Sequence, residues 1–433
     1  MTATSTTSTV VVDGAVPAPT RRHVGALDGM RALAAFGVVA THVGFNSGAS
    51  LGGGPLAPVL ARLDFGVTVF FLLSGYLLYS PFAIAALHDG AAPNVGRFYL
   101  RRALRILPAY WVAVTVTLFL LSARRPDGAD VASYLLLVQD YDGHNVDPSL
   151  THMWTLAVEL SFYAALPLLA HLARLARRRT AAGPAAALRG QLLLLGGLVL
   201  VAVATDVVAH AGRSTRQDIL IWLPANLDWF AAGMGLAVVA EALRSGVRLP
   251  RWVTGVRDAA TAPGSCWLVG GLLFALATLP LAGPRNLALP TAFEWTTKHW
   301  LYTGAALALL VPLVLGDGGV LGRVLASPPM RLLGDLSYGV YLWHLPLLLA
   351  MQRWLGYRTF SGHAPLLFVL VAGSATAVAA VSWFGLERPL LRLGAHRAPG
   401  SRGVSGLGSG ATRGTQDAVA DTTASTTAHQ QPS

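Results

Sequence analysis

An arginine and a histidine stand eleven positions apart in the first long apolar segment of the chain, Arg31 near its start and His42 near its end. In an α-helix, eleven residues make close to three turns and rise about 16 Å, so both side chains lie on nearly the same face at different depths. An imidazole titrates near neutral pH and can take a proton from a hydroxyl group, which makes His42 a candidate general base. The structural alternative is an arginine that reaches to the surface and a histidine that makes one hydrogen bond inside a bundle.

Two more arginines, Arg102 and Arg105, stand three positions apart where another apolar segment begins. Guanidinium groups at positions i and i+3 lie on one face of a helix and suit the binding of phosphate. A basic cluster in this place also serves as an ordinary anchor at the end of a membrane-spanning helix. The pair is therefore a candidate site for a phosphorylated ligand, with the anchor as its alternative.

A carboxylate and a second histidine interrupt later apolar segments. Glu159 follows Trp154 in a segment without another acidic residue, so it needs a histidine or arginine partner from another helix. His344 follows Tyr338 and precedes Pro346, where a proline kink can open a cavity; a structural histidine is the alternative. Weaker candidates for functional polar groups are Asn226, Asp228 and the sequence Glu387-Arg388-Pro389.

Small residues mark the apolar segment between the first histidine and the arginine pair. Gly66, Ser74 and Gly75 allow a close approach between helices, and Tyr76 follows them. Packing alone accounts for the glycines. Ser74 and Tyr76 are also candidates for the lining of a substrate cavity, as are Trp154, Tyr338 and His344 from later segments.

These residues must be positioned by membrane-spanning helices. The chain has 433 residues and is 54% hydrophobic but only 12% charged, whereas soluble domains carry about 25% charged residues. Its apolar runs approach the length of about 20 residues that crosses a bilayer, where only helices satisfy the backbone of a single segment. We therefore predict an all-α, polytopic integral membrane bundle of about ten transmembrane helices. The predicted spans are 27–46, 64–84, 104–122, 154–173, 191–210, 219–241, 265–282, 299–316, 334–352 and 365–385.

The distribution of charge predicts the orientation of this bundle. With ten spans, 23 of the 32 basic residues fall on the side that holds both termini, which predicts a multi-pass protein of the cytoplasmic membrane with both termini in the cytoplasm. The net charge of +11 comes from short dispersed clusters, so no nucleic-acid partner is expected. Only Lys298 is a lysine, and the single cysteine, Cys266, allows no intrachain disulfide.

Composition also divides the chain into three parts. Residues 1–21 and 394–433 are predicted to be disordered segments, the second of them polar, and residues 22–393 to form one transmembrane domain. The segment 131–139 is too short to span a bilayer and is expected to lie at the interface or to re-enter. No metal site is expected.

In order and spacing, these segments resemble the acyltransferase 3 family of bacterial membrane acyltransferases. The resemblance runs from about residue 22 to residue 393. The motifs that carry it are Arg31 with ten residues before His42, Phe70-Phe71-Leu72-Leu73-Ser74-Gly75-Tyr76, Arg102-x-x-Arg105, Trp154-x-x-x-x-Glu159 with Phe162-Tyr163, Ser337-Tyr338 with Tyr341-Leu342-Trp343-His344, and Glu387-Arg388-Pro389.

The resemblance implies transfer of an acyl group, acetyl above all, from cytoplasmic acyl-CoA to a hydroxyl group of a carbohydrate-containing or other small acceptor, such as a glycan or a glycosylated metabolite. It implies that His42 is the essential histidine, that Glu159 is catalytic, and that Arg31, Arg102 and Arg105 bind the donor. Some members carry an esterase-like domain after the membrane domain, and the short polar end of this chain predicts its absence.

Two mechanisms and two functions stay open at this point. His42 can deprotonate the acceptor for direct attack, with Glu159 orienting or charging the imidazole, or it can carry the acyl group itself. A transporter of a polar or anionic small molecule is the alternative function, because it too needs charges at membrane depth. The absence of an inverted hydropathy repeat counts against the transporter.

Overall fold

The computed structural model describes residues 21–396 except 89, 142–146, 180–183, 212–216, 246–250 and 286–287. Within these residues every regular element is a helix, which confirms the all-α prediction. The segments predicted to be disordered, 1–21 and 394–433, lie almost entirely outside the described residues.

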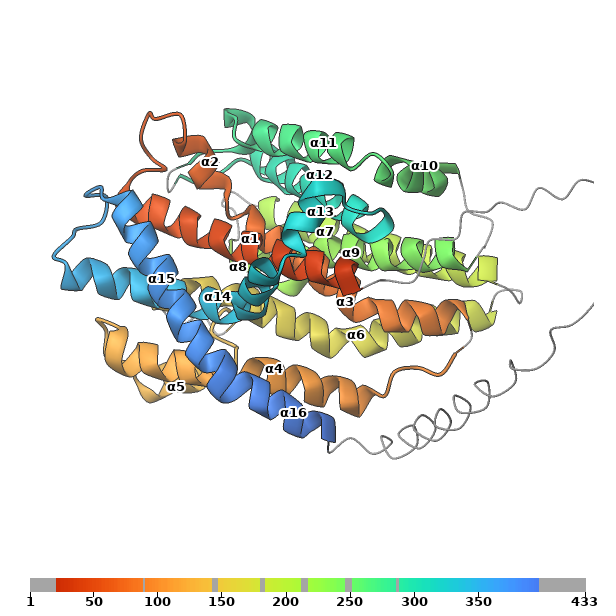
Figure 1. Cartoon of the computed structure of the whole chain (residues 1–433), viewed down its shortest axis with the longest axis horizontal. Coiled ribbons are helices and arrows are strands. Elements are labelled where there is room, and N and C mark those ends of the chain that lie inside the picture. The colour runs from red at the N-terminus through yellow and green to blue at the C-terminus, as the bar shows by residue number, and fades with distance from the viewer. Residues whose placement is uncertain are drawn as a thin grey trace, which may run out of the picture.

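Most of the long helices lie side by side with their axes along one common direction, and α15 runs obliquely across them (Figure 1). The long helices are α1 (Arg21–Ser47), α3 (Phe65–Leu87), α4 (Val95–Val116), α6 (Trp154–Arg179), α7 (Pro184–His210), α9 (Leu223–Arg244), α11 (Pro263–Ala277), α12 (Ala292–Leu315), α14 (Pro328–Trp354) and α15 (Ala364–Ser382). Shorter elements connect or extend them: α2 (Ala57–Arg62), η1 (Thr117–Leu121), α5 (Gly128–Leu135), η2 (Pro148–Met153), α8 (Gln217–Leu220), α10 (Arg251–Ala260), η3 (Pro280–Ala282), α13 (Gly319–Leu325), η4 (Trp383–Glu387) and α16 (Arg388–His396).

Length and composition support a membrane protein but not the full count of ten spans. Among the described residues seven helices are long and apolar enough to cross a membrane, or up to eight if the bent pair α10–α11 forms one span. The predicted spans 27–46 and 334–352 coincide with α1 and α14, which are not among those helices. Both carry charged or polar residues and pack against each other inside the bundle, where a helix needs no continuous apolar surface toward lipid. The number ten stays a prediction.

Glycines set the closest contacts between helices in the bundle. A Cβ atom on Gly233 of α9 would lie 2.0 Å from the carbonyl oxygen of Leu72 in α3, and one on Gly75 would lie 2.3 Å from that of Phe230. Gly66 meets α1 in the same way, at 2.3 Å from the carbonyl oxygen of Ala34. These contacts confirm the packing role predicted for Gly66 and Gly75, because any side chain would force the backbones apart.

The helix that carries Arg31 and His42 lies at the centre of this arrangement. Helix α1 packs along α14 on one side and against α3 on another. Helices α4 and α6 close the space beyond them, so residues from five helices can meet around α1. The segment 131–139 is confirmed as too short to span, since its helix α5 has only 8 residues and begins with a capping box at Asp127.

Candidate active site

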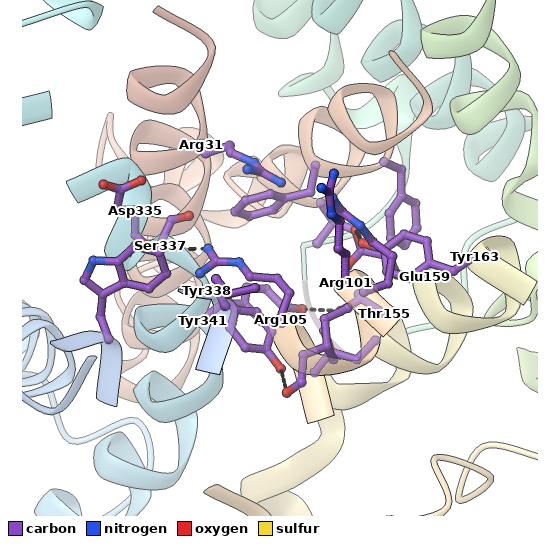
Figure 2. A pocket seen from close by; sticks show the side chains of 18 residues that line it. Arg31, Arg101, Arg105, Thr155, Glu159, Tyr163, Asp335, Ser337, Tyr338 and Tyr341 are labelled. Carbon is purple, nitrogen blue, oxygen red and sulfur yellow. Dashed lines mark hydrogen bonds between the residues drawn. The ribbon is translucent and has the colours of Figure 1, made fainter. Parts of the chain in front are cut away.

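A first cavity of about 410 Å³, the inner cavity, lies between α1, α3, α4, α6 and α14. Figure 2 shows its charged and aromatic side chains converging from these helices. The polar groups of its wall include Arg31, Arg101, Arg102, Arg105, Glu159, Tyr163, Asp335 and Tyr338. The predicted donor arginines are thus brought together in one cavity with Glu159, and cations outnumber carboxylates there.

Arg105 is held by the protein itself. Its Nη1 atom donates to the carboxylate of Glu387 at 3.0 Å, and the carboxylate side chain is only 2% exposed. Its guanidinium group also lies over the ring of Trp383, at 4.6 Å from the ring centroid. The motif Glu387-Arg388-Pro389 therefore supplies the counter-ion of Arg105, and Arg105 ties α4 to η4.

Arg102 and Arg31 have free hydrogen-bonding capacity by contrast. The Nε atom of Arg102 is buried and has no hydrogen-bond partner among the described residues. Arg31 extends from α1 toward the cavity in Figure 2 and makes no hydrogen bond to the described part of the protein. An unpaired buried donor is costly, so Arg102 is suited to meet an anionic ligand.

Glu159 accepts hydrogen bonds from two hydroxyl groups rather than from a histidine. The hydroxyl of Ser74 in α3 and that of Tyr163, at 2.5 Å, both donate to its Oε1 atom. No hydrogen bond joins Glu159 to His42 within the residues described, and the two side chains line different cavities. The structure therefore does not provide the predicted contact in which Glu159 orients or charges the imidazole.

A second cavity of about 1160 Å³, the outer cavity, contains His42. Val67 and Tyr341 line both cavities, so the two spaces meet at these side chains. Arg31 and His42 thus line different cavities from one helix, whereas their spacing predicts only one helix face at two depths. His42 also contacts the ring of His344, at 5.1 Å between ring centroids.

An ion pair lies in the wall of the outer cavity, where the side chain of Lys298 is 24% exposed and that of Asp64 is 39% exposed. Asp64 accepts from the Nζ atom of Lys298 at 2.7 Å and from the hydroxyl of Tyr302 at 2.5 Å. Lys298 is the single lysine of the chain. Arg62 anchors the same region, because its guanidinium group donates to the carbonyl oxygens of Ala277 and Ala282, at 2.9 Å each.

A second acid–base pair lies in the same wall. Asp228, predicted as a weaker candidate for a functional polar group, lies 2.7 Å from the Nε2 atom of His299, and its side chain is 2% exposed. The imidazole of His299 is stacked on the indole of Trp229, with 4.2 Å between centroids. Asn226 lines the cavity nearby. Together with several tryptophans, these groups give this cavity hydrogen-bonding and flat apolar surfaces.

The remaining predicted residues fall in different places. Trp154 lines the outer cavity, Tyr338 lines the inner one, and Ser74 reaches the site through Glu159. Tyr76 and His344 line neither of the two cavities, in contrast to the prediction. Tyr76 lies near Arg244 and Glu241 on α9. Residues two positions apart in an α-helix point about 200° away from each other, so Ser74 and Tyr76 cannot point the same way.

Sequence reasoning missed several residues of the site. They are Tyr163, His152, Asp64, Lys298 and His299. Two signals were present: Lys298 is unique in an arginine-rich chain, and His152 stands just before Trp154. Across the described ranges, no group of three or more His, Cys, Asp or Glu side chains is arranged to hold a metal ion.

Comparison with known proteins gives one family and several relatives. A family model described as an acyltransferase domain matches residues 24–384. The peptidoglycan O-acetyltransferase OatA of Listeria monocytogenes is 25% identical over 352 residues, which cover 76% of this chain and 50% of the relative. The putative peptidoglycan O-acetyltransferase YrhL of Bacillus subtilis is 28% identical over 355 residues, 76% of this chain and 49% of the relative.

A third relative, also an O-acetyltransferase, matches a longer part of this chain. The O-acetyltransferase OatA of Staphylococcus aureus is 22% identical over 396 residues, 86% of this chain and 58% of the relative. The chain therefore spans about half the length of the curated relatives it matches. No solved structure matches the chain.

Proposed function

The chain belongs to the acyltransferase 3 family, and we propose that it moves an acyl group, acetyl above all, from cytoplasmic acyl-CoA to a hydroxyl group of a glycan. The similarity to peptidoglycan O-acetyltransferases supports a carbohydrate acceptor and an acetyl group. The proposed setting is the cytoplasmic membrane, with ten spans and both termini in the cytoplasm. It is supported by the 23 of 32 basic residues that fall on the side of the termini when ten spans are assigned.

The observation that carries this proposal is the meeting of two unlike cavities beside one histidine. The inner cavity is lined by arginines, whereas the outer cavity is larger and lined by His42, aromatic rings and polar groups. Val67 and Tyr341 belong to both walls. An anionic donor in one space and a hydroxyl-bearing acceptor in the other would have their reacting groups brought together at this boundary.

The donor is expected to place its charges in the inner cavity. Arg31 and Arg102, which have unused donors, would bind the phosphates or the polar arm of acyl-CoA. Arg105 would shape the cavity without binding the donor, because its guanidinium group is already paired with the carboxylate of Glu387. The pantetheine arm would then carry the thioester past Val67 and Tyr341 toward His42.

His42 would act as the general base on the acceptor. It takes the proton of the acceptor hydroxyl while the oxygen attacks the thioester carbonyl carbon. The carbon–sulfur bond breaks as the ester bond forms, and the imidazolium returns its proton to the departing thiolate. Attack by His42 itself, with an acyl-histidine intermediate, is the second route, and it uses the same placement of the ring.

Release of CoA from acetyl-CoA by the purified protein in detergent tests the proposal. The wild type should release free thiol, faster when a chito-oligosaccharide is added, and His42→Ala should abolish it while retaining the wild-type elution volume. His171→Ala, on an exposed part of α6, is the matched control and should keep full activity. A folded wild type that neither binds nor cleaves acetyl-CoA would reject the donor and favour a transporter.

A further inference from the structure

Three imidazole rings form a contiguous group beside the boundary of the two cavities. The ring of His344 lies 5.1 Å from that of His42 and 4.7 Å from that of His152, measured between centroids. His344 is fully buried and His152 is 3% exposed. Of these three rings, His42 and His152 line the outer cavity and His344 does not, so His344 stands behind His42 as seen from that space.

Backbone carbonyl groups fix which nitrogen of each supporting ring carries the proton. The Nδ1 atom of His344 lies 2.6 Å from the carbonyl oxygen of Tyr341. A carbonyl oxygen can only accept, so Nδ1 is the protonated nitrogen and Nε2 of the neutral ring is bare. The Nε2 atom of His152 lies 3.3 Å from the carbonyl oxygen of Leu342, which leaves Nδ1 of His152 bare by the same argument.

The proline of α14 explains why one of these carbonyl groups is available. In a regular helix the carbonyl of Leu342 would accept from the N–H of residue 346. Residue 346 is a proline, which has no N–H and leaves that carbonyl without its helical partner. His152 fills this role from η2, so Pro346 sets the tautomer of a histidine on another element.

The result is two buried acceptor nitrogens that lack a donor. His344 Nε2 and His152 Nδ1 are both buried and neither has a hydrogen-bond partner within the described residues. Buried nitrogens of this kind are rare because the lost hydrogen bond to water is not replaced. His42 is the neighbouring ring that can supply an N–H, since no hydrogen bond engages either of its ring nitrogens in the part of the chain described.

We propose that His344 is a positioning residue whose Nε2 accepts the N–H of His42, so that the other nitrogen of His42 faces the outer cavity without a proton. The two rings are already neighbours, with 5.1 Å between centroids, and the His42 ring must turn so that one of its N–H groups points at Nε2 of His344. The arrangement resembles the way a buried carboxylate fixes the tautomer of a catalytic histidine, with a neutral acceptor in its place. Its consequence for turnover rests on the proposed function, in which His42 is the base.

Two substitutions at one position separate this role from packing. His344→Phe keeps a ring in the core but has no acceptor, so kcat for acetyl-CoA cleavage should fall by about 10²-fold or more with KM for acetyl-CoA unchanged. His344→Gln offers an amide oxygen and should restore kcat to within about 10-fold of the wild type. His171→Gln is the control, because it makes the same substitution at an exposed position of α6, and its kcat and KM should equal those of the wild type. A folded phenylalanine variant with wild-type kcat, or a glutamine variant no faster than phenylalanine, overturns the proposal.

A spectroscopic measurement decides the question without turnover. In protein labelled with nitrogen-15 histidine, at mildly alkaline pH, the His42 ring should show one protonated and one bare nitrogen in slow exchange, assigned by their loss in His42→Gln. In His344→Phe the two signals should merge toward their average. Averaged signals in the wild type overturn the proposal even if the enzyme is active. An inactive wild type with separate signals leaves the positioning role standing and rejects only the proposed function.

Discussion

Arg102 and Arg105 lie one helical turn apart and face the same cavity, yet their surroundings differ. Arg105 is paired with the buried carboxylate of Glu387, whereas Arg102 has a buried Nε atom without a partner. We expect Arg102→Gln to raise KM for acetyl-CoA by about 10-fold or more, since a charged hydrogen bond contributes about 1.5–3 kcal/mol, and to leave stability unchanged. Steady-state kinetics and thermal unfolding in detergent measure the two effects.

Arg105→Gln should show the opposite pattern. Removing one partner of a buried ion pair costs about 3–5 kcal/mol, because the other charge stays buried without compensation. The variant should unfold well below the wild-type temperature, and Arg105→Gln/Glu387→Gln should recover part of the loss. If Arg105→Gln is as stable as the wild type and changes only KM, Arg105 binds the donor directly.

At the scale of single residues, the sequence predicts which groups face the bundle but not which of them meet. His42 and the arginines stand out because polar groups are rare in apolar segments. The partners of Glu159 could not be predicted: the nearest donors, Ser74 and Tyr163, are neutral hydroxyls, while a charged partner was expected. Partner identity depends on which helices pack together and at what rotation, and that information is not local to any segment.

Helix α14 contributes to the site through a break in its own hydrogen bonds. In Pro346→Ala the restored N–H of residue 346 would compete with His152 for the carbonyl oxygen of Leu342. We expect kcat to fall by about 10-fold while KM for acetyl-CoA stays constant, and the helix to gain rather than lose stability.

Pro167→Ala provides the comparison, because this proline also lies inside a long helix, α6, but lines neither of the two cavities. Its kcat should equal that of the wild type. Equal losses of kcat in both variants would mean that proline acts through helix shape alone and not through His152.

The contact between α3 and α9 predicts a sharp dependence on one glycine. A Cβ on Gly233 would lie 2.0 Å from the carbonyl oxygen of Leu72, so Gly233→Ala should destabilise the protein by about 3 kcal/mol or more. Gly197 on α7 has nothing within 4 Å of the corresponding position, and Gly197→Ala should gain up to about 1 kcal/mol. Unfolding by SDS in mixed micelles measures both, and similar values for the two variants would contradict a close backbone contact.

At the scale of helices, apolar periodicity and length locate the long elements well. Each predicted span overlaps a long helix of the structure. The bend of 103° between α10 and α11 was not predicted, nor was the amphipathic α16 that continues α15 through η4. Both features arise where charged segments meet apolar ones, and tertiary packing rather than local propensity decides whether the helix breaks or continues there.

For the whole molecule, hydropathy and packing give different answers on whether α1 and α14 cross the membrane as their neighbours do. Neither is among the helices that pass as spans by hydropathy, although they carry His42 and His344. They run alongside the apolar helices and contact each other along their length. A bundle whose reactive groups lie on its central helices must bury those helices, and this makes their hydropathy a poor guide to their topology.

Site-directed labelling tests this topology directly. Single cysteines are introduced into a Cys266→Ala background on either side of α14. The two positions are Val324, before the helix, and Ser361, after it, and both residues are exposed. If α14 crosses the membrane, a membrane-impermeant maleimide should label Ser361→Cys in intact cells and Val324→Cys only after permeabilisation. Gly53→Cys and Val95→Cys, on either side of the apolar α3, calibrate the outer and cytoplasmic patterns. Labelling of positions 324 and 361 from the same side would show that α14 does not span, and would leave His42 and His344 without the fixed depth that donor and acceptor need in order to meet.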